Sequence, residues 1–256
     1  MLRALLSHPL TRELEIDDPR TTTLRRQIVQ RKRFLRKIYE EWYGSILEAL
    51  PSDKGPVLEI GSGAGFLKDA IPEAITSEVF FCSSVDIILD GCQLPFAAET
   101  LRGIVMTDVF HHLPQARSFL REATRCVRQG GVLVMIEPWV TPWSRLIYQK
   151  LHHEAFRPEA PDWEFPKTEP LSGANGALPW IIFQRDREQF GSEFPQWHIQ
   201  TIKLMMPFRY LVSGGVSLRS LQPGWSYALW CKLEYSLRPL MPKLAMFAQI
   251  VLDKVN

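Results

Sequence analysis

The chain has 256 residues, of which 46% are hydrophobic and 23% are charged, and these proportions exclude a disordered or collagen-like chain. This length is enough to bury a full core in one domain with added segments. The 30 basic and 28 acidic residues nearly cancel, and the net charge of +2 gives no reason to expect nucleic acid as a partner.

Two further counts bear on the compartment of the protein. No stretch of the sequence reaches the roughly 18 to 20 apolar residues that are needed to span a bilayer. The four cysteines show no C-x-x-C spacing and lie in apolar stretches, which favours buried free thiols over a disulfide or zinc framework. We therefore expect a cytoplasmic protein.

A single long amphipathic helix is predicted for residues 24–50. Its apolar positions recur at three-, four- and seven-residue steps, and they are Leu24, Ile28, Leu35, Ile38, Trp42 and Ile46. Its first half, from Arg25 to Lys37, carries seven basic residues without an acidic one, namely Arg25, Arg26, Arg31, Lys32, Arg33, Arg36 and Lys37. Such a run is either a solvated helix face or a contact for phosphates or an anionic membrane. We treat residues 1–50 as an N-terminal extension and residues 51–256 as the main domain.

Short apolar runs alternate with helical or loop segments between residues 57 and 136. The runs cover residues 57–60, 75–80, 85–89, 104–107 and 132–136. Strands that are buried on both faces have this appearance, and their alternation with helices predicts a parallel sheet. An apolar stripe from Ala116 to Val127 predicts a helix that ends near Gly130 and Gly131.

An insertion rich in proline and aromatic residues follows at about 139–183. Long irregular insertions in compact domains are usually functional loops, and we expect this one to build a substrate pocket. Residues 184–194 then have a helical pattern, residues 198–206 have that of a strand, and residues 244–252 form a last apolar element of either type.

The most informative motif is the segment V-L-E-I-G-S-G-A-G-F, which begins at Val57. It predicts a strand that runs into a glycine-rich turn. Glycines lack a Cβ atom, so the backbone can turn sharply and lie directly against a ligand at the start of a helix.

The glycine spacing E-x-G-x-G-x-G differs from the G-x-G-x-x-G fingerprint of dinucleotide-binding proteins. It resembles motif I of the class I S-adenosylmethionine-dependent methyltransferases, in particular those with a type 11-like domain. The resemblance extends over roughly residues 57–138. It implies a Rossmann-like, mostly parallel seven-stranded sheet with flanking helices, S-adenosylmethionine as cofactor and S-adenosylhomocysteine as product. The motif residues that it assigns to cofactor binding are Glu59, Gly61, Ser62, Gly63 and Gly65.

Three later segments continue the resemblance. Glu78 matches the acid at the end of the second strand, which binds the ribose of the cofactor in that family. Asp90 and Gly91 match the adenine-binding position after the third strand, and Thr107 lies at the end of the fourth. The sequence departs from the family between Val79 and Val85, where only five residues remain for a connection that usually holds a helix.

The segment after the fourth strand offers candidate catalytic residues. Asp108 and His111 would project beyond the carboxyl end of the sheet, where open α/β sheets bind ligands, and either could act as a base for a hydroxyl acceptor. We expect no metal here, because the adjacent histidines His111 and His112 would diverge on a strand. His152 and His153 are predicted to form a polar helix end with Glu154 or to contact substrate.

These features together predict methyl transfer from S-adenosylmethionine to a small-molecule or lipid- or saccharide-linked acceptor. The alternatives are a methyltransferase-like domain that binds the cofactor without turnover and a Rossmann oxidoreductase that uses NAD or FAD. The expected partners are the small-molecule acceptor and, through the basic N-terminal helix, the surface of a membrane. We expect no nucleic acid.

Overall fold

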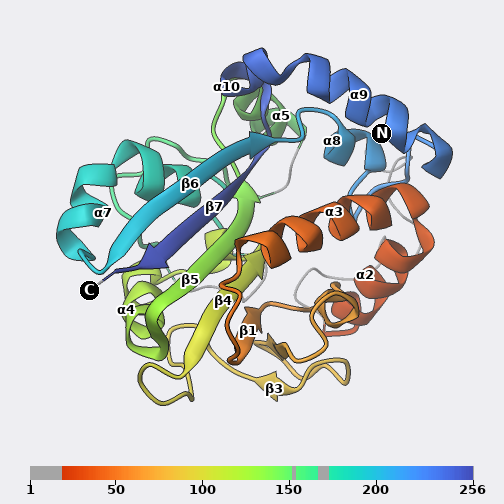
Figure 1. Cartoon of the computed structure of the whole chain (residues 1–256). Helices are drawn as coiled ribbons and strands as arrows, with labels where there is room; N and C mark the ends of the chain where they lie inside the picture. Colours follow the sequence, from red (N-terminus) through yellow and green to blue (C-terminus); the bar gives the residue numbers. More distant parts are fainter. Residues whose placement is uncertain (1–18, 152–153, 167–172, 256) are drawn as a thin grey trace.

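The computed structural model describes residues 19–151, 154–166 and 173–255. Its strands form one seven-stranded sheet in the order β3-β2-β1-β4-β5-β7-β6 (Figure 1). The strands are β1 Val57–Ile60, β2 Ile75–Glu78, β3 Ile87–Ile88, β4 Leu101–Thr107, β5 Val127–Pro138, β6 Trp197–Met205 and β7 Phe247–Lys254. Strands β1 to β5 run parallel, and β7 is antiparallel to both β5 and β6. The predicted mostly parallel, Rossmann-like sheet is confirmed.

The central strands are apolar on both faces because helices cover the sheet on either side. Strands β1 and β4 pair through Leu58 and Ile104, and both side chains are fully buried. Helix α3 crosses one face (Figure 1), where the Trp42 ring lies 5.3 Å from that of Phe247. Burial on both faces explains why these strands appear in the sequence as continuous apolar runs.

Most of the described helices follow β4 in the chain, and among the residues that the structure describes only α2 and α3 precede β1. The α-helices are α2 Pro19–Arg31, α3 Arg33–Ala49, α4 Ala116–Cys126, α5 Pro142–Leu151, α6 Leu178–Trp180, α7 Arg187–Glu193, α8 Arg209–Ser213, α9 Tyr227–Ser236 and α10 Met241–Leu244. Shorter turns are η1 Leu67–Asp69, η2 Phe110–His112, the π-turn η3 Ile181–Arg185, η4 Gly224–Ser226 and η5 Arg238–Leu240. Within the described ranges, none of these helices has the length and apolar character that crossing a bilayer requires.

The prediction of one continuous helix over residues 24–50 is wrong, because the helix is interrupted at Lys32. This residue leaves the helical conformation, with φ −81° and ψ 89°. Its ammonium donates hydrogen bonds to the carbonyl oxygens of Ser213, Gly215 and Leu218. The tertiary contact with three backbone carbonyls therefore outweighs the local preference for an unbroken helix.

The short connection between β2 and β3 contains no helix, as the sequence indicates. The two strands pair in parallel, with Ser77 opposite Ile87. The carboxylate of Asp86 accepts hydrogen bonds from the amide and the hydroxyl of Thr76, at 2.8 and 2.9 Å, and so fixes the return of the chain. Because β3 is only two residues long, the chain has a short distance to return along β2, and the connection can stay short.

Three boundaries in the second half differ from the predictions. Helix α4 ends at Cys126, and Gly130 and Gly131 lie inside β5 instead of ending the helix. A Cβ on Gly131 would meet Val127 Cγ1 at 2.6 Å, which accounts for a glycine within the strand. The predicted helix over 184–194 is divided into the π-turn η3 and helix α7, and the last apolar element is the strand β7. All four cysteines are free thiols, as expected, but only Cys82 and Cys126 are buried, whereas Cys92 and Cys231 are partly exposed.

Candidate functional site

The glycine-rich turn after β1 is tied to the neighbouring strand ends. The Ser62 amide donates to the Ser77 carbonyl at 2.8 Å, and the Ser77 amide donates to Ser62 Oγ at 3.1 Å. Gly61 has φ +68°, and a Cβ there would lie 2.5 Å from Val109 Cγ2. The turn thus requires glycine both for its backbone conformation and for its close approach to the segment after β4.

Glu78 lies at the carboxyl end of β2 and faces this turn. Its carboxylate accepts hydrogen bonds from the Gly63 amide at 3.0 Å and from its neighbour Val79 at 3.2 Å. Burial raises the pKa of Glu78 above its usual value, although both amide bonds oppose the shift. The sequence therefore located Glu78 correctly beside the turn, and its role toward a ribose remains a proposal.

Two buried polar atoms at the ends of β1 and β4 have no hydrogen-bond partner among the described residues. They are Glu59 Oε2 and Thr107 Oγ1. Burial raises the pKa of Glu59 to about 7, and the charge of Glu78 adds to the shift. Buried polar groups are normally satisfied, so these two atoms fit a site that is completed by a polar ligand.

Helices α2 and α3 pack over the glycine-rich turn, a contact that the sequence did not reveal. A Cβ on Gly63 would meet Glu78 Oε2 at 2.8 Å and Thr22 Cγ2 at 3.2 Å. On Gly65 it would meet the Tyr43 hydroxyl at 2.3 Å, and this hydroxyl also accepts from the Phe66 amide. The N-terminal segment is therefore a wall of the site.

Asp90 and Gly91 form the turn that follows β3. Asp90 is exposed, and its Oδ1 accepts a hydrogen bond from the Cys92 amide at 2.9 Å. Gly91 is buried, and a Cβ there would lie 3.2 Å from Leu113 Cδ2. Both residues lie near the carboxyl edge of the sheet, where the family resemblance puts an adenine.

A buried cluster of carboxylates surrounds His111 in turn η2. His111 Nδ1 donates to Glu137 Oε2 at 2.7 Å, and His111 Nε2 lies 3.4 Å from Glu154 Oε2. Glu137 Oε1 also accepts the amides of Val109 and Phe110, at 2.9 and 2.7 Å. Burial alone would lower the pKa of His111, but the two carboxylates hold it well above its usual value. His111 is therefore an imidazolium at neutral pH.

The expectation that His111 and His112 diverge is wrong, because both residues lie in a 3-10 turn and not on a strand. Their ring centroids are 4.2 Å apart, and His112 Nε2 lies 3.8 Å from Glu154 Oε1. Burial and the charge of His111 lower the pKa of His112 to about 3, so its ring is neutral. Ligand atoms of these three residues lie within 4.8 Å of one another, a spacing that could hold a metal ion. The absence of a metal stays a prediction, and His152 and His153 lie outside the described residues.

Asp108 forms part of the wall of a small cavity, about 20 Å³ in volume, beyond the ends of β4 and β5. Burial raises the pKa of Asp108 to about 7, and its backbone has φ +61°. The cavity is lined by Asp108, Pro138, Tyr148, Glu154, Ala155, Phe156, Gly176, Tyr210 and Phe247. The predicted candidates Asp108 and His111 thus share one acidic cluster, whereas Asp90 lies on a separate turn.

Several residues of this site were not found from the sequence. Glu137 had a usable signal, because it is a charged residue at the carboxyl end of a buried apolar strand. Glu154 was expected only as part of a polar helix end, and nothing in the local pattern marks Tyr148. Tyr210 lies on the short helix α8, and only the packing of α8 against the sheet brings it to the cavity.

Comparison with known proteins agrees with this arrangement. Residues 66–135 match the family described as "Methyltransferase domain". No curated protein matches the sequence. The match covers β2 to most of β5, and the sheet order adds the rest of the methyltransferase fold. Residues 66–135 are therefore similar to a methyltransferase domain, in agreement with the resemblance seen in the sequence.

Solved structures show the same fold at low sequence identity. An S-adenosylmethionine-dependent methyltransferase from Archaeoglobus fulgidus is 14% identical, with a TM-score of 0.52 over 86% of this chain and 94% of that one. Geranyl diphosphate C-methyltransferase from Streptomyces coelicolor A3(2) is 10% identical, with a TM-score of 0.50 over 86% and 81%. A chain of the complex between the Haloferax volcanii Trm112 methyltransferase activator and a methyltransferase is 11% identical, with a TM-score of 0.50 over 90% and 97%.

Proposed function

We propose that this protein binds S-adenosylmethionine beside the glycine-rich turn and transfers its methyl group to an acceptor in the adjoining cavity. The observation that carries the proposal is the pair of unsatisfied buried atoms, Glu59 Oε2 and Thr107 Oγ1, at the strand ends next to that turn. Glu78 would serve the ribose, and Asp90 with Gly91 would serve the adenine. The geranyl diphosphate C-methyltransferase of the same fold was solved with S-adenosylhomocysteine, which supports this cofactor.

At about 20 Å³ the cavity has room for a group of about the size of a water molecule, and we infer that it takes the hydroxyl of the acceptor, for which Asp108 is the base. His111 is already protonated through its contact with Glu137, and it cannot take a second proton. Asp108, with a pKa of about 7, can accept one near neutral pH. Bound S-adenosylmethionine would supply an activated methyl group on a sulfonium, which requires no covalent catalyst from the protein. The side chains of this chain orient the hydroxyl, exclude water and hold its proton on Asp108.

Apolar rings make up much of the cavity wall, which favours an acceptor with a hydrophobic or ring-bearing part. Tyr148 and Phe156 stack with ring centroids 4.7 Å apart, and Tyr210 lies 4.7 Å from Phe247. The insertion at about 139–183 contributes Tyr148, Glu154 and Phe156 to this wall. We infer a small-molecule or lipid- or saccharide-linked acceptor, of which only the reacting group enters the cavity.

Calorimetric titration tests the cofactor. The protein should bind S-adenosylmethionine and S-adenosylhomocysteine and should ignore NADH. Binding of NADH alone would instead support the oxidoreductase alternative.

Methyl transfer is tested with S-adenosylmethionine that carries a radiolabelled methyl group, in extracts supplied with the protein. Asp108→Asn should bind the cofactor and lose about 100-fold or more in rate, in the range expected for removal of a general base. Cofactor binding without a labelled product from any extract would favour the domain that binds without turnover.

A further inference from the structure

Helix α9 buries a charged side chain and exposes leucines to solvent. Glu234 is 4% exposed and points into the protein, whereas Leu229 and Leu233 are 58% and 45% exposed. A surface helix normally turns its apolar stripe to the core and its charges to water. The exposed leucines therefore indicate that the outer face of α9 contacts another surface.

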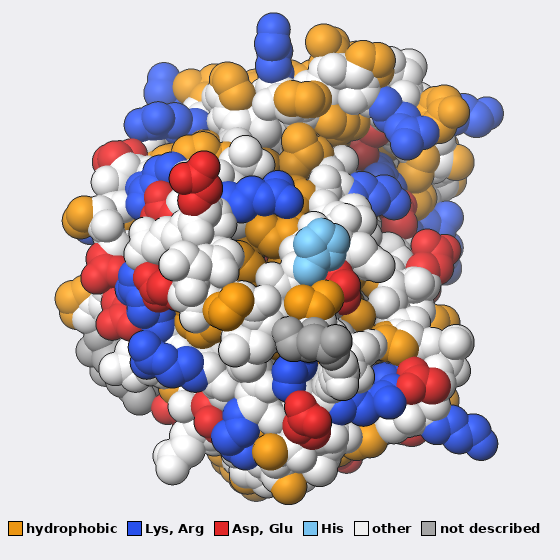
Figure 2. Space-filling view, turned by 60° about the vertical axis from the view of Figure 1, so that its left-hand side comes forward, with side chains coloured by type: hydrophobic (Ala, Val, Ile, Leu, Met, Phe, Trp, Pro, Cys, Tyr) orange, Lys and Arg blue, Asp and Glu red, His pale blue; other side chains and the backbone are white. Residues whose placement is uncertain are grey.

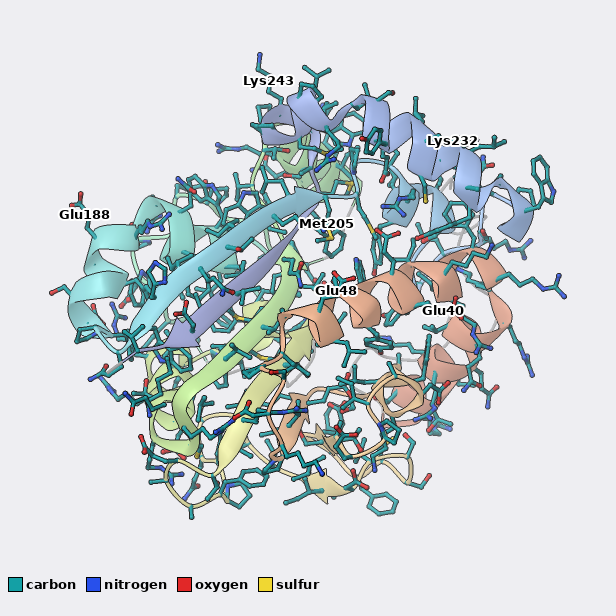
Figure 3. The ribbon with its side chains drawn as sticks, in the orientation of Figure 1. Glu40, Glu48, Glu188, Met205, Lys232 and Lys243 are labelled. Atoms are coloured by element: carbon teal, nitrogen blue, oxygen red, sulfur yellow. The ribbon has the colours of Figure 1, made fainter. Side chains whose placement is uncertain are left out.

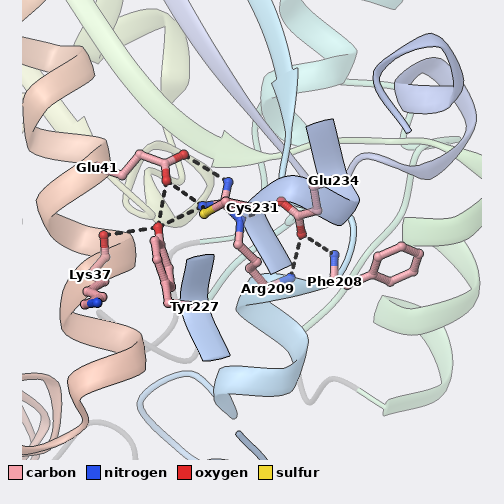
Figure 4. A network of polar contacts seen from close by, with 7 residues as sticks. All are labelled: Lys37, Glu41, Phe208, Arg209, Tyr227, Cys231 and Glu234. Atoms are coloured by element: carbon pink, nitrogen blue, oxygen red, sulfur yellow. Dashed lines mark hydrogen bonds and ion pairs between the residues drawn. The ribbon is translucent and has the colours of Figure 1, made fainter. Parts of the chain in front are cut away.

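An internal network of charged groups holds the helix in this orientation (Figure 4). Arg209 Nε donates to Glu234 Oε2 at 2.6 Å, and Arg209 Nη2 donates to Glu41 Oε1 at 2.9 Å. Glu234 also accepts the amides of Phe208 and Arg209, at 3.1 and 2.8 Å. Tyr227 closes the network through its hydroxyl, which donates to Glu41 at 2.6 Å. Turning α9 over would separate Glu234 from the buried Arg209 guanidinium and from the amides of Phe208 and Arg209, and these contacts therefore hold the leucines of α9 outward.

The outer side of α9 and its flanking turns carries several exposed apolar side chains. We call it the α9 face, and its residues are Leu221, Trp225, Leu229, Leu233 and Leu240, which are 58%, 76%, 58%, 45% and 46% exposed. Trp225, Leu229 and Leu233 follow one another at four-residue steps, which puts them on one side of the helix. In Figure 2, hydrophobic side chains gather along the top of the molecule among lysine and arginine side chains. Gathered apolar side chains of this kind usually mark an interaction surface.

The segment that carries the α9 face is basic. Between residues 219 and 243 the basic residues are Arg219, Lys232, Arg238 and Lys243. The single acidic residue in this range is Glu234, which is buried against Arg209. Lys232 and Lys243 extend away from the body of the protein on the outer side of α9 and α10 (Figure 3). Exposed Arg33 of α3 adjoins this region, because its Cβ lies 2.7 Å from the Cβ position of Gly224.

We propose that the α9 face docks the protein on the surface of a membrane with anionic phospholipids. Exposed leucines and a tryptophan suit insertion among the headgroups and upper acyl chains, and surrounding lysines and arginines suit the lipid phosphates. Exposed apolar residues within a basic segment suit an anionic lipid surface better than a protein partner of ordinary composition. The proposal moves the membrane contact from the basic run at residues 25–37, where Lys32 is engaged with backbone carbonyls, to α9.

Helix α9 contacts helix α8, which contributes a residue to the wall of the proposed acceptor cavity. Arg209 is the first residue of α8, and the next residue, Tyr210, lines the cavity. Glu234 of α9 holds both the side chain and the amide of Arg209. A membrane under α9 would thus lie next to the helix that carries part of the cavity wall.

Flotation of the full-length protein with vesicles tests the proposal. Vesicles of phosphatidylcholine with about one third phosphatidylglycerol should bind the protein, and pure phosphatidylcholine should bind it weakly. Lys232→Gln with Arg238→Gln should lower the partition coefficient roughly 25-fold, from about fivefold for each charge. Trp225→Ser with Leu229→Gln should lower it at least tenfold. These side chains are exposed, and cofactor titration and thermal melting will show that the variants remain folded.

Phe81→Ser supplies the matched control, because Phe81 is 76% exposed like Trp225 but lies in the β2–β3 connection. It should float like the unchanged protein. The proposal fails if anionic vesicles do not bind the protein, or if Phe81→Ser weakens binding as much as Trp225→Ser with Leu229→Gln. It also fails if sedimentation without lipid shows a dimer that the α9 variants dissociate, since the face would then join two copies of this chain.

Discussion

Replacement of Glu137 by glutamine tests the proposed protonation of the buried cluster. The carboxylate of Glu137 accepts three hydrogen bonds, from the amides of Val109 and Phe110 and from the His111 ring. If the single side-chain oxygen of glutamine accepts the two backbone amides, its NH2 group faces the His111 ring in place of the carboxylate oxygen. The substitution removes the charge of a buried ion pair, a change that costs about 3 kcal/mol when one partner is lost. For a domain of this size we expect a melting temperature lower by about 6 to 12 °C.

The loss should depend on pH in a defined direction. The contact with Glu137 raises the pKa of His111 in the folded protein above its unfolded value of about 6.5. The stabilisation is therefore complete below about pH 6.5 and is lost as the pH rises through the higher folded value. The difference in unfolding free energy between the unchanged protein and Glu137→Gln should be largest near pH 6 and should shrink at alkaline pH.

Urea denaturation followed by tryptophan fluorescence measures this difference at a series of pH values. Glu48→Gln, at an exposed position of α3 (Figure 3), is the control and should change stability by less than about 0.5 kcal/mol. A Glu137→Gln penalty below about 1 kcal/mol, or one that is equal at pH 6 and pH 9, would refute the assignment of an imidazolium at His111.

Three other predictions concern the ligand site. Gly63→Val should abolish S-adenosylmethionine binding in calorimetry, because its Cβ would lie 2.8 Å from Glu78 Oε2. The control Gly44→Ala, whose Cβ has no atom within 4 Å, should bind the cofactor normally and gain about 0.5 to 1 kcal/mol of stability. Unchanged affinity of the Gly63 variant would show that the turn is misassigned. Cofactor affinity should rise up to about tenfold from pH 6 to pH 8, because Asp108 with a pKa of about 7 ionises and attracts the cationic ligand; a flat profile, or one that Asp108→Asn leaves unaltered, would contradict this. Treatment with a chelator should leave methyl transfer unchanged, because His111 is already paired with Glu137 and Glu154. Activity that is lost with the chelator and restored by a divalent cation would instead reveal a metal at His111, His112 and Glu154.

The class of fold and the glycine-rich turn after β1 could be predicted from the sequence because both depend on local patterns. Apolar runs indicate buried strands, and glycines at Gly61 and Gly63 indicate a turn that no larger residue can make. The location of Glu78 at the end of β2 followed from counting along the same pattern. These patterns can be recognised in the sequence, because each depends on residues within a few positions of one another.

The acidic cluster, the walls of the site and the α9 face were decided by tertiary structure alone. Glu137 reaches His111 only because β4 and β5 are adjacent in the sheet, and Tyr43 reaches the glycine-rich turn only because α3 crosses it. The break at Lys32 and the orientation of α9 follow from ion pairs and carbonyl contacts between distant segments. The physical reason is that periodicity along a chain specifies which face of an element is apolar, whereas buried charges take their partners from whichever elements pack against them.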